Sequence, residues 1–76
     1  MEADLKNIKS EKITVERKHF FFDLKENQRG RFLRITEDVR GRRDTIIIPA
    51  PGLHEFRRVL DSMIEASMKD GDQAQT

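Results

Sequence analysis

The chain has 76 residues, with 15 Lys or Arg against 14 Asp or Glu and no cysteine. This length supports one domain with a modest core, and the lack of cysteine excludes a disulfide framework and a cysteine nucleophile. Residues 1–10 contain no apolar run typical of a signal peptide, and no stretch approaches the roughly 20 apolar residues of a membrane helix. We therefore expect a cytoplasmic protein that does not enter a membrane.

Positive charge is concentrated in the middle of the chain. Between Arg17 and Arg43 there are nine cations and four acids, although the net charge of the whole chain is only +1. Fixed charges act over a Debye length of about 8 Å at physiological salt, so a locally basic surface attracts polyanions even on a nearly neutral protein. An ordinary solvated surface is the alternative interpretation of the same charges.

Four segments alternate apolar and polar residues with the period of a β-strand. Strands are predicted over 12–16, 19–26, 30–38 and 44–48. Residues 1–10 have few apolar side chains and are predicted to be a flexible lead-in. Because the connections between the strands are short, the pattern favours an antiparallel meander.

The second and third predicted strands form a β-hairpin whose register follows from the apolar positions. With Lys25 opposite Phe32, two apolar pairs fall on one face, where they can build a core, while Lys25 and Phe32 fall on the other. A ring beside a positive charge suits a nucleotide, because bases stack on rings and phosphates pair with cations. The two apolar pairs are Leu24 with Leu33 and Phe22 with Ile35.

Two further apolar residues are expected on the same face as Phe32. The alternation turns Phe21 outward within the second strand, and it turns Ile47 outward within the fourth. Phe21 then needs cover from a ligand, a partner subunit or another segment, unless it is an ordinary, partly covered surface aromatic. Asp23 and Arg34 are expected to face each other across this hairpin.

A change of period after residues 49–52, which contain two prolines and a glycine, marks the start of a helix. The helix is predicted from Leu53 to about Lys69, and residues 70–76 are predicted to be a disordered tail. The fold class is thus α+β, a four-stranded antiparallel β-meander followed by one C-terminal helix that covers one face of the sheet. The apolar stripe of the helix, which is expected to form core and dimer contacts, consists of Leu53, Phe56, Leu60, Met63 and Ile64.

Residue patterns that would support catalysis are missing from the sequence. His19 and His54 are too far apart to match a zinc-ligand spacing, and the carboxylates are scattered over predicted loops and strand ends. No glycine-rich phosphate loop precedes the helix, and no serine has a triad partner. We therefore expect no enzyme, no metal, no cofactor and no small-molecule substrate.

The hairpin also carries a family resemblance. The run Lys-x-Asn-x-x-Gly-Arg-Phe-Leu over 25–33, together with the strand-to-helix passage over 45–57, resembles the repeat of the purine-rich-element-binding (PUR) family. The resemblance covers roughly residues 12–66 and implies a β-β-β-β-α repeat over 11–69. In this family two repeats interlock, with their helices crossing between the halves. A chain with one repeat looks like the bacterial type and is expected to form an intertwined homodimer.

The resemblance implies binding of single-stranded, purine-rich DNA or RNA, and separation of duplex strands without ATP. Such a protein would be cytoplasmic and, if it binds DNA, associated with the nucleoid. The residues carried over from the family are Lys25, Asn27 and Arg29 for backbone and base contacts and Phe32 for base stacking. Their charge and position add Arg31 and Arg34 to this set.

Two other functions remain open at this stage. The chain can be a protein-interaction or structural dimerisation module with no direct nucleic-acid role, or a translational regulator directed at RNA. The presence of Asn27 favours nucleic-acid binding, because a dimer interface has no need for a Lys-x-Asn-x-Arg sequence at a loop tip, whereas base-edge recognition has.

Overall fold

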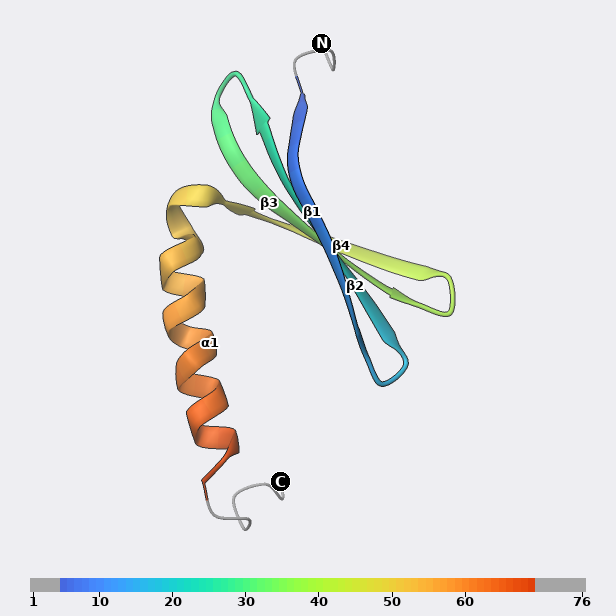
Figure 1. Ribbon diagram of the computed structural model, residues 1–76, viewed down its shortest axis with the longest axis vertical. Coiled ribbons are helices and arrows are strands. Elements are labelled where there is room, and N and C mark those ends of the chain that lie inside the picture. Colours follow the sequence, from blue (N-terminus) through green and yellow to red (C-terminus); the bar gives the residue numbers. More distant parts are fainter. Residues whose placement is uncertain (1–4, 70–76) are drawn as a thin grey trace.

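The computed structural model describes residues 5–69, which form one antiparallel sheet and a C-terminal helix (Figure 1). The strands follow one another in the order β1-β2-β3-β4, each hydrogen-bonded to the next. The predicted α+β meander with one C-terminal helix is therefore confirmed. Residues 1–4 of the predicted lead-in and the predicted tail over 70–76 lie outside the described residues. The elements are β1 (Lys6–Val15), β2 (Lys18–Asn27), β3 (Gly30–Val39), β4 (Arg42–Pro49), the 3₁₀ helix η2 (Ala50–Gly52) and α1 (Leu53–Ser67).

β1 begins at Lys6, well before the predicted start at Lys12. It pairs with β2 along its whole length, from Lys6 opposite Glu26 onward, with an irregularity between Asn7 and Lys9. This pairing uses backbone groups and needs no apolar side chain, so a polar segment can extend the strand. The prediction of a flexible lead-in is therefore wrong for residues 6–10.

The tight turns require left-handed backbone at four residues. Gly30 begins β3 with φ 134°, and Arg40 and Gly41 connect β3 to β4 with φ 56° and 86°. Glu16 adopts φ 57° in the turn between β1 and β2. Glycine reaches this region freely, whereas an arginine or glutamate there carries strain of about 1–2 kcal/mol.

The register sorts the side chains onto two different faces. Strand alternation places most of the large aliphatic and aromatic residues on one side and most of the unpaired cations on the other. We call the side with Ile13, Phe20, Phe22, Leu24, Leu33, Ile35, Ile46 and Ile48 the apolar face. We call the side with Lys12, Phe21, Lys25, Phe32, Arg34, Arg43 and Ile47 the basic face.

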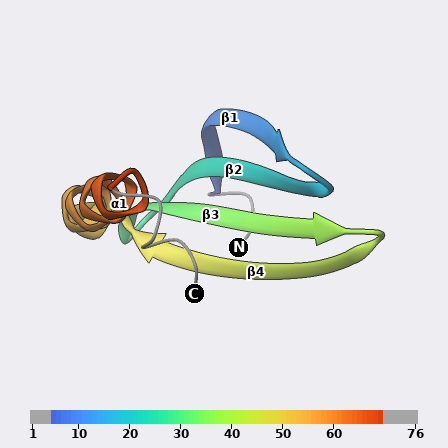
Figure 2. The same cartoon turned by 90° about the horizontal axis from the view of Figure 1, so that it is seen from below.

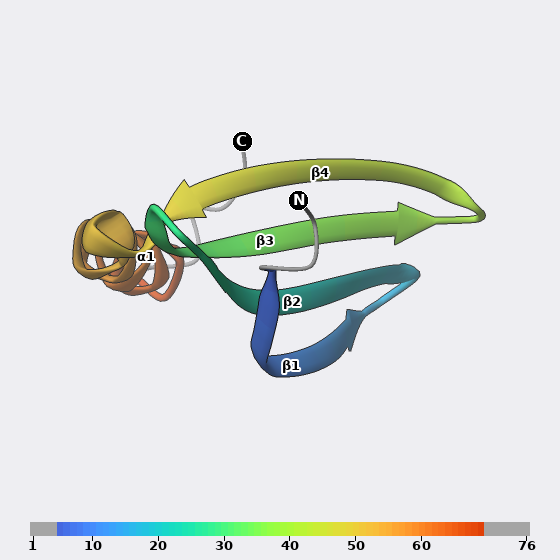
Figure 3. The ribbon, with the colours of Figure 1, turned by 90° about the horizontal axis from the view of Figure 1, so that it is seen from above.

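α1 projects from the end of the sheet and covers neither face. Figure 1 shows it running apart from the sheet on one side, and Figures 2 and 3 show it nearly end-on at the end of the sheet where β3 begins and β4 ends. η2 follows β4 directly and leads into α1, which therefore begins beyond the end of the sheet. The prediction that the helix covers one face is therefore wrong within this chain, because residues 54–67 are all exposed.

Few side chains are buried within one chain. Ile48 on the apolar face is 5% exposed, and Thr36 on the basic face is 8% exposed. At the rim of the apolar face, by contrast, Ile13 and Ile46 remain about half exposed. The sheet thus has an apolar face with no second layer over it among the described residues, although a sheet normally buries one face to be stable.

Candidate nucleic-acid interface

The turn between β2 and β3 is held by a side chain from the predicted site. Asn27 accepts a hydrogen bond on Oδ1 from the backbone N–H of Arg29, at 2.8 Å. This contact is an Asx turn, which fixes the backbone two residues ahead. The amide nitrogen of Asn27 can still donate to a ligand, and its oxygen keeps a second lone pair that can accept.

The predicted register of the hairpin is confirmed at its central pair. Lys25 lies opposite Phe32, and Phe32 lies opposite Pro49 on its other side. Phe32 is half-buried, so part of its ring remains accessible to a ligand. It borders a shallow hollow of about 370 Å³ lined by Asn27, Arg29, Gly30, Arg31, Phe32, Ile47 and Pro49.

The cations of the hairpin differ in how they are compensated. Arg31 lies opposite Glu26 and forms an ion pair with it at 3.5 Å. Alternation turns Arg31 toward the apolar face, away from Lys25 and Phe32, although it still lines the rim of the hollow. Within residues 5–69, neither Lys25 nor Arg29 forms an ion pair, so their charges are available to a polyanion.

Arg34 lies deeper on the basic face and has an unusual environment. Asp23 lies opposite Arg34, as predicted, but it accepts a hydrogen bond from the hydroxyl of Ser10 at 2.6 Å instead of pairing with the guanidinium. The Nε atom of Arg34 is buried and has no hydrogen-bond partner in the described part of the chain. A buried donor without an acceptor is costly, which makes a ligand or water oxygen at this position favourable.

Phe21 is covered by two cations that the sequence alone does not bring together. The Lys12 ammonium and the Arg43 guanidinium each lie 5.4 Å from the centre of its ring. Lys12 is its partner in β1, and Arg43 comes from β4. Such contacts contribute about 0.5–1 kcal/mol at exposed sites. They provide the cover that the sequence predicted Phe21 to need, without a ligand.

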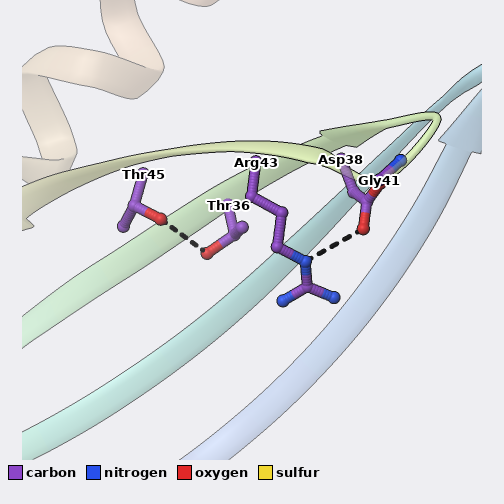
Figure 4. A network of polar contacts seen from close by, with 5 residues as sticks. All are labelled: Thr36, Asp38, Gly41, Arg43 and Thr45. Carbon is purple, nitrogen blue, oxygen red and sulfur yellow. Dashed lines mark hydrogen bonds and ion pairs between the residues drawn. The ribbon is translucent and has the colours of Figure 1, made fainter.

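Hydrogen bonds across β3 and β4 fix the position of Arg43. Figure 4 shows its Nε donating to Asp38 at 3.0 Å, next to the hydrogen bond between the hydroxyls of Thr36 and Thr45. Asp38 also accepts a hydrogen bond from the backbone N–H of Gly41 at 3.0 Å, which anchors the turn. The basic face therefore has an ordered centre with cations around one ring.

The predicted helix residues do not join the hairpin site. Leu53 is half-buried near the start of α1, and the other four residues of the stripe are exposed. Phe56 is 45% exposed and Leu60 is 57% exposed. Phe56 and Leu60 also line a hollow on the helix surface of about 310 Å³. The stripe thus forms a second apolar surface beside the uncovered apolar face of the sheet.

The described residues contain no cluster of three or more His, Cys, Asp or Glu side chains that could hold a metal ion. In the same part of the chain, no helix has the length and apolar character needed to cross a membrane.

Comparison with known proteins identifies what the chain is similar to. A family model described as "PurA ssDNA and RNA-binding protein" matches residues 1–76. The human transcriptional activator protein Pur-alpha is 48% identical over 65 residues, covering 76% of this chain and 20% of the human protein. Human purine-rich element-binding protein gamma is 38% identical over 71 residues, with the same coverage of both chains.

A plant protein is also similar to this chain over a small part of its own length. Transcription factor Pur-alpha 1 of Arabidopsis thaliana is 51% identical over 47 residues, covering 62% of this chain and 16% of the plant protein. The chain therefore spans about a fifth or less of the length of these relatives.

Proposed function

Because this chain belongs to the PurA family of single-stranded DNA- and RNA-binding proteins, we propose that it binds single-stranded nucleic acid through the β2–β3 hairpin and the adjoining basic face. The observation that carries this proposal is the cross-strand pair of Lys25 and Phe32. It places the half-buried ring of Phe32, which borders the hollow, beside a cation that forms no ion pair within residues 5–69. Stacking on the ring and pairing with phosphates are the two contacts that single-strand binding requires.

The phosphate contacts are assigned to the cations that lack acidic partners. Within residues 5–69, Lys25 and Arg29 supply charges without ion pairs near the hairpin, and the guanidinium of Arg34, whose buried Nε lacks a partner, also forms no ion pair. Arg31 contributes less in this scheme, since a strand must compete with Glu26 for its guanidinium. Each contact releases condensed counterions from the strand, so affinity should fall as salt rises.

Base contacts are assigned to Phe32 and Asn27. A base stacked on the Phe32 ring would contribute about 1–3 kcal/mol. The Asn27 amide nitrogen can donate to a base or phosphate acceptor, and a bidentate contact with adenine would use the second lone pair of the Asn27 oxygen, because the first accepts from Arg29. A ring that holds one base out of the stack disfavours pairing of that base with a complementary strand, which is how duplex separation would proceed without ATP.

The second part of the proposal is an intertwined homodimer of the single-repeat type. Its support is that the apolar face and the stripe of α1 are both uncovered in one chain, where Leu60 is 57% and Ile64 is 54% exposed. A second copy can lay its helix on this face and receive the first helix in return. Completing the burial of each half-exposed apolar side chain would contribute about 1 kcal/mol. The basic face would remain free.

A dimerisation or protein-interaction module without a nucleic-acid role is the second candidate. The uncovered apolar face favours this candidate as much as the first. It does not, however, account for the unpaired cations around Phe32 and Arg34, which lie on the opposite side of the sheet. A role as a translational regulator would differ from the leading proposal only in its RNA target.

Fluorescence anisotropy separates these functions. The probes are a labelled purine-rich single strand in DNA and RNA form, its pyrimidine complement and the duplex, each at low and moderate salt. We expect tight, salt-sensitive binding with preference for the purine strand, and comparison of the two purine probes shows whether the chain binds DNA or RNA more tightly. Absence of binding to every single strand at low salt would reject the proposal and favour the dimerisation module.

A further inference from the structure

A second basic hollow lies at the end of the sheet farthest from the β2–β3 hairpin. Figures 1 and 3 show that the β1–β2 and β3–β4 turns share this end, whereas the β2–β3 turn lies at the other. Residues of both turns line a concave space of about 830 Å³ between them. We call it the distal hollow, and its lining consists of Arg17, Lys18, Val39, Arg40, Gly41, Arg42 and Asp44.

Most charges in the distal hollow lack a compensating partner. Four of its lining residues are cations, and Asp44 is the one acid among them. Lys18 forms an ion pair with Glu37 at 3.1 Å. The three arginines are exposed, and within residues 5–69 none of them forms an ion pair or a side-chain hydrogen bond. With Asp44 in the lining and Glu37 beside Lys18, two acids stand against four cations, so the hollow keeps a net positive charge.

The backbone conformation of Arg40, in the turn between β3 and β4, is a second reason to assign a role to this hollow. Arg40 adopts φ 56° and precedes Gly41, which also has positive φ, as a type I′ turn requires. Asparagine or glycine would occupy this position without strain, whereas arginine is strained there. Strain that persists at an exposed turn points to a role for the side chain rather than for the fold.

The composition of the distal hollow favours a phosphate ligand over a protein. Protein interfaces depend on a few buried aromatic or aliphatic anchors, and Val39 is the one large apolar residue in this lining. Three guanidinium groups that form no ion pair within residues 5–69 match instead the planar, bidentate geometry of phosphate recognition. The repeating phosphates of a nucleic-acid backbone can occupy several of them at once.

We propose that the distal hollow is a second phosphate-binding site for nucleic acid, formed by Arg17, Arg40 and Arg42 and separate from the hairpin. This inference rests on the proposed function for the identity of the polyanion. β2 and β3 each have 10 residues, so the two sites lie about 33 Å apart at about 3.3 Å per residue. A 5-mer that keeps the stacked rise of about 3.4 Å per nucleotide spans about 17 Å, about half of this distance, whereas a 20-mer is long enough for both sites.

The test compares a purine-rich 5-mer with a 20-mer, using the full chain and the triple variant Arg17→Ala/Arg40→Asn/Arg42→Ala. The asparagine keeps the turn, and the other two changes remove no observed contact. The matched control, Arg57→Ala/Arg58→Ala/Lys69→Ala, removes the same charge from the region of α1. Circular dichroism checks that each variant is folded.

For the 20-mer, loss of three phosphate contacts should make the slope of log affinity against log salt shallower by about 2. The triple variant should bind the 20-mer more weakly than the full chain does. The ratio of the two affinities should increase about 18-fold when salt is lowered from 200 to 50 mM. The control variant should keep the original slope.

A 20-mer slope that is the same in the triple variant and the full chain would overturn the second site. The second site would also be overturned if the control variant loses as much affinity for the 20-mer as the triple variant does. Such an equal loss would reflect net charge alone. The 5-mer tests the proposed function separately: if Phe32→Leu leaves 5-mer binding unchanged, the hairpin assignment fails whatever the distal hollow does.

Discussion

Replacing Phe32 with leucine tests whether this ring stacks on a base. The side chain is half-buried beside Ile47 and Pro49, and leucine keeps an apolar contact there while removing the aromatic face. Stacking contributes about 1–3 kcal/mol per base, and each 1.4 kcal/mol is a tenfold change in Kd. We therefore expect the affinity for a purine-rich single strand to fall by about 5- to 150-fold.

Two further features make this test specific. The ring carries no charge, so the loss should be equal at 50 and 200 mM salt, unlike the loss of a phosphate contact. Phe32→Trp keeps an aromatic face and should bind at least as tightly as the unmodified chain. The assay is fluorescence anisotropy, with circular dichroism to confirm that the sheet is intact. If Phe32→Leu is folded and binds with unchanged affinity, the stacking role is refuted.

Four other changes probe the remaining parts of the account. Lys25→Ala combined with Arg29→Ala should make the slope of log affinity against log salt shallower by about 1.4. Its loss of affinity relative to the unmodified chain should then increase about 7-fold when salt is lowered from 200 to 50 mM. An unchanged slope would show that neither residue contacts a phosphate. Leu60→Asp should convert a dimer to a monomer, as measured by light scattering. Leu60 is 57% exposed in one chain, and a charge at this position becomes costly when a second copy covers it. A retained dimer would contradict the assignment of α1 to the dimer contact. Gly30→Ala should lower the free energy of unfolding by about 1–3 kcal/mol in urea titrations. The cost comes from backbone strain at φ 134° and not from a clash, because the added Cβ meets no atom within 4 Å. An unchanged midpoint would show that this backbone conformation is not needed. Arg40→Asn should raise the same free energy by about 1 kcal/mol, and a loss of stability would argue against strain at this turn.

The hairpin register could be predicted from the sequence because local and global preferences agree there. Alternating apolar residues fix which side of each strand is buried, and a glycine marks the turn. Lys25 opposite Phe32 follows from this pattern alone, and the structure confirms it. The order of elements was predictable for the same reason, since the period changes from two to about 3.6 after the proline-rich segment.

Features that depend on partners distant in sequence could not be predicted in this way. The early start of β1 at Lys6 depends on the backbone of β2, which leaves no apolar pattern in β1 itself. The cover of Phe21 by Lys12 and Arg43 requires the registers of both outer strands. Asp23 accepts a hydrogen bond from Ser10, a residue assigned to the lead-in, and it forms no ion pair with Arg34.

The position of α1 illustrates a different limit of sequence patterns. An amphipathic stripe shows that a helix needs cover, but it does not say whether its own sheet or another chain supplies that cover. Here the helix leaves the end of the sheet, and its own apolar face stays open. The homodimer therefore stays a prediction, and Leu60→Asp is the direct test of it.

An NMR titration of the isotope-labelled chain with a short purine-rich single strand would locate the proposed interface directly. Backbone amide shifts locate the contact surface without any substitution. We predict that the largest changes fall between Lys25 and Arg34, with residues of α1 little affected. Changes confined to α1 and the apolar face, with an unperturbed hairpin, would contradict the proposed interface.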